Sequence, residues 1–247
     1  MAINFAGGTD LIDYGNGGSS WVTGCFAFWM KTTQATANAL PAALWARATS
    51  RHGSGFVLNN TAGKILAQGY DSSTPRMLVS STTTVNDGNW HHVALNFDTQ
   101  NGGSNTLFID GRQEATANSS AAWPINFTGE LFLGSAPTFW PSYVGDLAEL
   151  GLWFNRKLDA AEIAALAKAF SPSKIAPTSL GFHAPLVRSA NSRAGGVTPT
   201  ITGTTELQWS SRRLPSRCRR QGPWRAHETR ARLTSLSQTN MKYTRLC

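Results

Sequence analysis

A catalytic site in this sequence would have to be built from a pair of carboxylates. A glycosidase needs two carboxyl groups, about 5 Å apart when it retains configuration and further apart when it inverts it. Two side chains on one strand share a face only when they are an even number of residues apart. Asp146 and Glu149 are three residues apart, and Asp10 and Asp13 have the same spacing. We therefore predict no catalytic residues and no enzymatic activity.

Histidines and cysteines do not form a metal or redox motif in this sequence. His91 and His92 are adjacent, so on a strand they point to opposite faces and cannot bind one metal ion together. We expect His91 to be a core histidine that is hydrogen-bonded to the backbone. Cys25 begins an apolar stretch and is expected to be a buried thiol. Cys218 and Cys247 could pair with each other, but the odd cysteine count favours a reducing compartment.

Aromatic residues in loops give the best sequence evidence for binding. The chain has nine tryptophans, and those in strand-like contexts are expected in the core. Exposed rings in loops could stack on a sugar or anchor a protein contact, and the protein contact is favoured slightly. The candidates for a glycan or protein contact are Trp123, Phe139, Trp140 and Tyr143.

Basic residues are concentrated at the C-terminal end of the chain. Ten of the 22 Lys and Arg residues, but only one of the 14 acidic residues, lie in residues 212–247, so residues 1–211 have a net charge of −1. Clustered arginines pair with phosphates or carboxylates, so this arm is expected to contact an anionic partner. A solvated extension, or an altered reading frame, explains the same composition. The residues proposed for the contact are Arg212, Arg213, Arg217, Arg219, Arg220 and Arg225.

The strands that would position these residues are clearest in residues 86–111. Residues 86–89, NDGN, are typical of a turn. Residues 90–97 alternate, and the set with Val93, Leu95 and Phe97 is predicted to form the buried face of an antiparallel strand. A second strand over residues 107–109 ends at Asp110-Gly111, a dipeptide that favours a tight hairpin.

This block resembles the D-G-x-W-H-H-V-A … L-Y-V-D-G signature of laminin-G-like domains in the concanavalin A-like lectin and glucanase superfamily. Residues 143–158, YVGDLAELGLWFNRKL, resemble the closing strand of that family, and residues 5–10, FAGGTD, resemble its opening. The resemblance covers residues 1–170. It implies an all-β, concanavalin A-like jelly-roll sandwich of two antiparallel sheets. It implies little about activity, because this fold carries lectins, glycosidases, adhesion modules and structural proteins.

The resemblance also raises the question of calcium, because many laminin-G-like domains hold one ion at the rim with loop oxygens. The oxygen ligands that a calcium ion prefers are available in loops here. The alternative is that the same residues close Asx turns. We expect no other cofactor and leave calcium open, with the candidate ligands Asp71, Asp87, Asn89 and Asp146.

Three segments are predicted: a sandwich over residues 1–170, an extended segment with a last strand over 171–211, and the basic arm over 212–247. Asp159 and Glu162 have the spacing of a capping box, which predicts a short helix over residues 160–169. Residues 180–187 predict a strand. Together with the polar run GGVTPTITGTT that follows, they resemble the region after the laminin-G-like domain in tailed-phage structural proteins. We expect this segment to add a last strand or to leave the sandwich along a neighbouring subunit.

Composition is consistent with one sizeable β domain: 41% of residues are hydrophobic and 23 are glycine. No apolar run is long enough to span a bilayer, and the N-terminal residues lack the pattern of a secretory leader, so we expect no membrane contact. The sequence predicts a non-enzymatic structural protein of a phage virion, either a capsid decoration or a fibre component. Its expected partners are other virion subunits, including copies of itself, and less readily nucleic acid. The alternatives are an extracellular carbohydrate-binding lectin module, with a surface glycan as its partner, and then a glycoside hydrolase.

Overall fold

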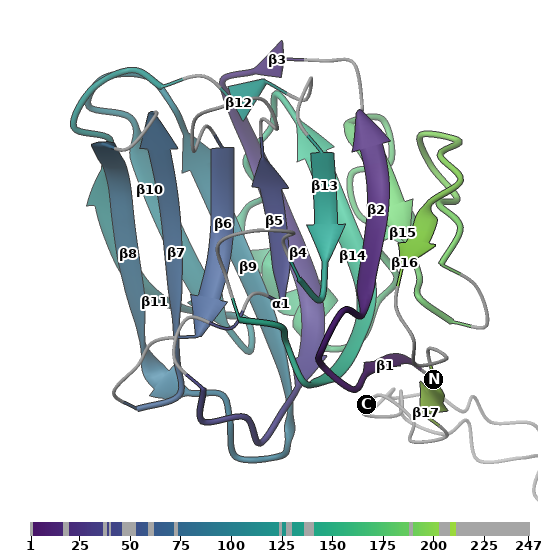
Figure 1. Ribbon diagram of the computed structural model, residues 1–247. Helices are drawn as coiled ribbons and strands as arrows, with labels where there is room; N and C mark the ends of the chain where they lie inside the picture. The colour runs from purple at the N-terminus through teal and green to yellow at the C-terminus, as the bar shows by residue number, and fades with distance from the viewer. Residues whose placement is uncertain are drawn as a thin grey trace, which may run out of the picture. The chain divides into compact units, whose positions relative to one another are not determined.

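The computed structural model describes residues 2–16, 20–36, 39, 41–45, 53–58, 62–71, 74–123, 125–126, 130–135, 141–187, 190–202 and 208–210. All of these residues lie in one compact unit, Met1–Arg217. They form two antiparallel sheets that lie one behind the other (Figure 1), a short two-stranded pair and one α-helix. This arrangement confirms the predicted all-β sandwich. Among the described residues, no helix has the length and apolar character needed to cross a bilayer.

The first sheet, sheet A, has the strand order β11-β10-β9-β4-β14-β1-β17, and β15 also pairs with β14. Its strands are β1 (Ala2–Phe5), β4 (Thr23–Lys31), β9 (Trp90–Asp98), β10 (Ser104–Ile109), β11 (Arg112–Asn118), β14 (Gly145–Phe154), β15 (Leu180–Ala184) and β17 (Gln208–Ser210).

The second sheet, sheet B, has the order β16-β2-β13-β5-β6-β7-β8. Its strands are β2 (Leu11–Asn16), β5 (Ala42–Trp45), β6 (Gly53–Leu58), β7 (Lys64–Asp71), β8 (Thr74–Thr84), β13 (Glu130–Leu133) and β16 (Thr200–Thr202). The separate pair consists of β3 (Ser20–Trp21) and β12 (Ile125–Asn126).

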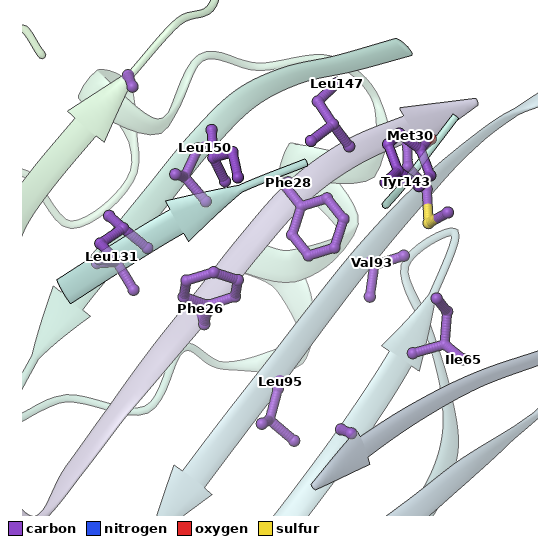
Figure 2. Close-up of a cluster of buried hydrophobic side chains, with 14 of the residues drawn as sticks. Phe26, Phe28, Met30, Ile65, Val93, Leu95, Leu131, Tyr143, Leu147 and Leu150 are labelled. Atoms are coloured by element: carbon purple, nitrogen blue, oxygen red, sulfur yellow. The ribbon is translucent and has the colours of Figure 1, made fainter. Parts of the chain in front are cut away.

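The core lies between the two sheets, and alternation along β9 selects the side chains that enter it. Val93, Leu95 and Phe97 are fully buried in one cluster with Phe26 and Phe28 of β4. The rings of Phe26 and Phe28 meet edge to face, with centroids 5.8 Å apart. Figure 2 shows several of these side chains together with residues of other strands. The predicted buried face of β9 is therefore confirmed.

The β10–β11 hairpin turns at Asp110 and Gly111, as predicted. Their φ angles are 51° and 80°, so both residues of the two-residue turn are in the left-handed region. Turns of this kind match the twist of a β-hairpin and favour the Asp-Gly dipeptide. The Asp110 carboxylate also accepts a hydrogen bond from the backbone N–H of His92 at 2.8 Å, which ties the turn to β9.

The outer face of sheet A is covered by α1 (Ala160–Ala167). The predicted capping box is present: the Asp159 side chain accepts from the N–H of Glu162, and the Glu162 side chain accepts from the N–H of Asp159. Ile163 and Leu166 of the helix pack with Ala94 on the outward side of β9. The helix ends two residues earlier than predicted. The chain then makes one turn of 3-10 helix, η1 (Pro172–Lys174).

The segment after residue 170 supplies three further strands. β15 pairs with Leu150 to Trp153 of β14, beside the stretch of β14 that pairs with β1. β16 pairs with β2 at one edge of sheet B, and β17 pairs with β1 at one edge of sheet A. Of the two expectations for this segment, the described residues therefore follow the first, strands added to the same sandwich. The boundaries at residues 170 and 211 remain predictions.

Candidate functional site

A charged network lies where the turn before β9 meets the β10–β11 hairpin. His91 Nδ1 donates to Asp110 Oδ2 at 2.8 Å, and His91 Nε2 donates to Asp87 Oδ1 at 3.1 Å. A neutral imidazole has only one N–H, so two carboxylate partners require the imidazolium form. The hydrogen bond with Asp110 raises the pKa of His91, against the opposing effect of burial. The expected backbone partner of His91 is therefore wrong: its side chain bonds to two carboxylates.

The four predicted calcium ligands are held in three separate arrangements. Asp87 accepts from the backbone N–H of Asn89 at 2.8 Å and from its side-chain amide at 2.9 Å, which closes an Asx turn. These contacts lower the pKa of Asp87 to about 2. Asp146 accepts from the Asn4 amide at 2.8 Å, and Asp71 pairs with an arginine of β8 at 3.0 Å. Within the described part of the chain, no three His, Cys, Asp or Glu side chains could hold a metal ion together. Asp71, Asp87 and Asp146 therefore do not form a three-carboxylate cluster, and calcium binding stays a prediction.

Two of the four candidate aromatic contacts are core residues. Trp123 is 2% exposed, and its Nε1 donates to the Ser119 hydroxyl at 3.1 Å. Tyr143 is fully buried; its hydroxyl lies 3.0 Å from the carbonyl oxygen of Lys31, and burial raises its pKa. The expectation of exposed rings is wrong for both, because both side chains pack into the core cluster between the sheets. Phe139, Trp140 and the six candidate arginines lie outside the described residues.

A β-bulge in β14 changes the predicted orientation of Glu149. The pairing with β4 shifts register between Ala148 and Gly151, and Glu149 itself has φ 50°. Its carboxylate accepts from His183 Nε2 at 3.0 Å and from the Ser171 hydroxyl at 3.3 Å. His183 alternates with two core residues of β15 and so points outward, and Glu149 joins it on that outer face.

Asp146 also lies on this outer face, because the next residue, Leu147, points into the core. The prediction that Asp146 and Glu149 point to opposite faces is therefore wrong, since a bulge breaks the period of two. The two carboxylates nevertheless have different hydrogen-bond partners. The contact between Glu149 and His183 joins residues 34 positions apart, and no local spacing in the sequence indicates it.

On the outward side of sheet B, an aromatic ring lies beside an amide that is only 3% exposed. In β7, Ala67 lies in the core, and a Cβ on Gly69 would contact the buried Trp123 ring, so Gln68 and Tyr70 point outward. The Tyr70 hydroxyl donates to Gln68 Oε1 at 2.9 Å. Gln68 is in register with Leu78 of β8, which is 48% exposed.

Gln68 Nε2 is buried and has no hydrogen-bond partner among the described residues. An aromatic ring and an exposed apolar side chain on a sheet face suit the apolar surface of a sugar. We call Gln68, Tyr70 and Leu78 the sheet B platform. The alternation in KILAQGYD could have identified it from the sequence.

Comparison with known proteins relates this architecture to lectin-like domains. The family model for laminin G-like domains of the concanavalin A-like lectin/glucanases superfamily matches residues 7–164. Neuronal pentraxin-2 of Mus musculus is 27% identical over 153 residues, which is 54% of this chain and 35% of the mouse protein. The chain thus spans about a third of the length of the curated relatives it matches.

Two solved structures show the same fold at low sequence identity. A heptameric SAP-like pentraxin from Limulus polyphemus is 14% identical with a TM-score of 0.57, covering 83% of this chain and 97% of that chain. The CBM40 module of a Ruminococcus gnavus IT-sialidase, bound to α2,3-sialyllactose, is 18% identical with a TM-score of 0.51. That likeness covers 67% of this chain and 96% of the module.

Proposed function

Because the chain belongs to the concanavalin A-like lectin/glucanases superfamily, we propose that it is a non-enzymatic module that recognises carbohydrate. The observation that carries this proposal is the sheet B platform, where an aromatic ring, an amide and an exposed leucine share one face. The Tyr70 ring would stack on the apolar face of a sugar, and the buried Gln68 amide, which accepts from the Tyr70 hydroxyl, would hold that ring in place. No charged group is needed for this recognition.

The test is binding to a printed array of neutral and sialylated oligosaccharides, with sialyllactose among the probes. Tyr70→Ala removes the ring and should weaken binding at least about tenfold, as expected for loss of an aromatic anchor. Tyr70→Phe keeps the ring and should weaken it less. Phe170→Ala is the matched control, because Phe170 is a 43% exposed aromatic residue that follows α1, away from the platform. Equal losses in Tyr70→Ala and Phe170→Ala, or no binding to any probe, would contradict the proposal.

The absence of enzymatic activity is a second part of this proposal. Glu149 is bonded to His183 and Ser171, an arrangement that holds a strand and the exit of a helix in place. We predict no release of reducing sugar from β-glucans, agar or other polysaccharides. Glu149→Gln should leave glycan binding unchanged. Hydrolysis above the blank that disappears in Glu149→Gln would overturn this part.

The second candidate function is that of a structural protein of a phage virion, as a capsid decoration or fibre component. It is supported by the likeness of the polar run GGVTPTITGTT and the preceding strand to phage structural proteins, and by the ten basic residues in 212–247. The arginines would contact acidic surfaces of neighbouring subunits or, less readily, nucleic acid. Deleting residues 212–247 should leave the sandwich folded and reduce incorporation into purified particles. Normal incorporation of the truncated protein would exclude the arm as the attachment device.

A further inference from the structure

Two β-bulges face each other on one lateral side of the sandwich, where β11 of sheet A lies beside β8 of sheet B (Figure 1). In β11, Gln113 and Ala115 pair with consecutive residues of β10, so Glu114 between them is an extra residue in the ladder. An extra residue of this kind redirects its side chain. Ala115 packs against the core, whereas the carboxylate of Glu114 reaches across to β8.

The bulge in β8 is larger, because residues 81–83 all lie opposite one residue of β7, Ile65. The Ile65 N–H donates to the Ser81 hydroxyl at 3.0 Å, and that hydroxyl donates to the carbonyl of Thr83 at 2.8 Å. These hydrogen bonds hold the bulge against β7. Successive N–H groups of a regular strand point in opposite directions, but the bulge allows those of Thr82 and Thr83 to point the same way.

Four donors of β8 converge on the Glu114 carboxylate. Glu114 Oε2 accepts from the backbone N–H of Thr82 at 2.8 Å, from the backbone N–H of Thr83 at 2.9 Å and from the Thr82 hydroxyl. Glu114 Oε1 accepts from the Thr83 hydroxyl at 2.8 Å. Successive N–H groups that point one way form an anion-binding concavity. We call these four donors the threonine cradle.

The threonine cradle holds its carboxylate by hydrogen bonds from neutral groups. Desolvation raises the pKa of Glu114, but the hydrogen bonds from Thr82 and Thr83 outweigh it, so the pKa of Glu114 is lowered. The cradle therefore favours an ionised carboxylate. Thr82 is exposed and Glu114 is half-buried, so the contact is also open to an anion from solution.

We propose that the threonine cradle is a carboxylate-binding site, that Glu114 is its resident ligand, and that a carboxylate from solution can replace Glu114 there. Replacement would release the contact between β8 and β11 and leave both bulges in place. The observation that carries this inference is that two edge strands each contain a bulge, and together the bulges aim four donors at one carboxylate. The cradle shares no residue with the sheet B platform, so the inference does not depend on carbohydrate binding.

Acetate titration of the full-length chain tests the site, with chloride keeping the ionic strength constant and the NMR amide signals of Thr82 and Thr83 as the readout. Glu114→Ala empties the cradle, so acetate should shift both signals and saturate. Wild-type protein should bind acetate at least about tenfold more weakly, because the tethered Glu114 carboxylate competes at a high effective concentration. Gln113→Ala is the matched control on the same strand and should respond as wild type does. Unchanged signals in Glu114→Ala, or equal affinities of Glu114→Ala and wild type, would overturn the proposal.

Two further variants decide the question if Glu114→Ala does not fold. Glu114→Gln keeps the length of the side chain without its charge, so this variant should also bind acetate more tightly than wild type. Adding Thr82→Val and Thr83→Val to Glu114→Gln removes both hydroxyl donors and should weaken acetate binding at least about tenfold, because each hydroxyl makes a charge-assisted hydrogen bond. Acetate should therefore raise the urea midpoint of Glu114→Gln and leave that of the triple variant unchanged. An equal rise in both proteins would show that acetate binds elsewhere and would overturn the site.

Discussion

The two faces of β9 are both buried, but they are buried in different ways. Toward the core, Val93, Leu95 and Phe97 pack against apolar side chains of both sheets. On the other face, Ala94 packs under α1, and Asn96 makes two hydrogen bonds to the backbone just before the helix. The inner face of β9 is therefore stabilised by the burial of apolar side chains from many strands. The outer face is stabilised by α1 and by hydrogen bonds to the residue just before that helix.

This difference explains why the outer face of β9 is harder to identify from its sequence. An alternating strand in an antiparallel sheet usually has one face in water, so its polar residues suggest exposure. Here Asn96 is only 7% exposed, because its amide bonds to both the N–H and the carbonyl of Leu158. A polar side chain on a strand can thus mark a docking point for a later segment.

The largest change should follow from removing a core side chain on the inner face. Phe97→Ala should lower the free energy of unfolding by about 3 to 5 kcal/mol, because it leaves a cavity where the ring packs closely over Gly24. Urea denaturation measures the change, with Phe170→Ala as an exposed aromatic control. A midpoint close to wild type would mean that the inner face of β9 has been assigned to the wrong side.

A smaller change should follow from removing the polar contact on the outer face. Asn96→Ala leaves the buried N–H and carbonyl of Leu158 without their partner and should cost about 1 to 3 kcal/mol. Thr106→Ala removes a side chain from β10 whose contact is exposed and should cost much less. If the two variants unfold at the same denaturant concentration, the outer face does not depend on the Asn96 contact.

The N-terminal cap of α1 should contribute less than either face of the strand. Asp159→Ala removes the carboxylate that accepts from the N–H of Glu162 at 2.8 Å and should cost about 1 kcal/mol. Asp159→Asn retains an acceptor oxygen at that position, so it should recover most of the loss. Thermal unfolding of the three proteins measures this, and an Asn variant no better than Ala would argue against the capping role.

The subtlest expected effect is on the pH dependence of stability, where His91 and His92 should act in opposite directions. Burial lowers the pKa of His92 to about 4, and His91 has a raised pKa. Between pH 4 and the ordinary pKa of about 6.5, the unfolded state binds more protons at His92, so stability rises with pH. Above about pH 6.5 the unfolded state has lost the His91 proton, whereas the folded state still holds it. The stability that charged His91 contributes is therefore lost as pH rises through the folded pKa of His91.

His91→Gln should flatten the decline above about pH 6.5 and leave the rise at lower pH in place. Denaturant midpoints measured in steps across this range would show it. Because Asp87 and Asp110 both face His91, each single Asn variant should shift the declining limb toward lower pH. An unchanged decline in His91→Gln would assign it to another group.

Local patterns in the sequence were sufficient for the elements whose residues interact over short separations. The β9 strand, the Asp110-Gly111 turn and the Asp159 capping box each depend on side-chain period, left-handed backbone or neighbouring hydrogen bonds. The candidate binding residues were predicted less well. Trp123 and Tyr143 were expected to be exposed because they lie in loops, and both are buried.

The sequence by itself determined the core-facing residues of β9, the hairpin turn and the capped helix, because those depend on periodicity and on contacts between neighbours in the chain, and the resemblance to laminin-G-like domains implied the sandwich. Only the tertiary structure decided which face Glu149 occupies, because one bulged residue reverses the alternation after it. It also brought His183 to Glu149 and Asn96 to Leu158 across more than thirty residues. Contacts of that kind depend on how strands pair and fold over one another, which no local spacing encodes.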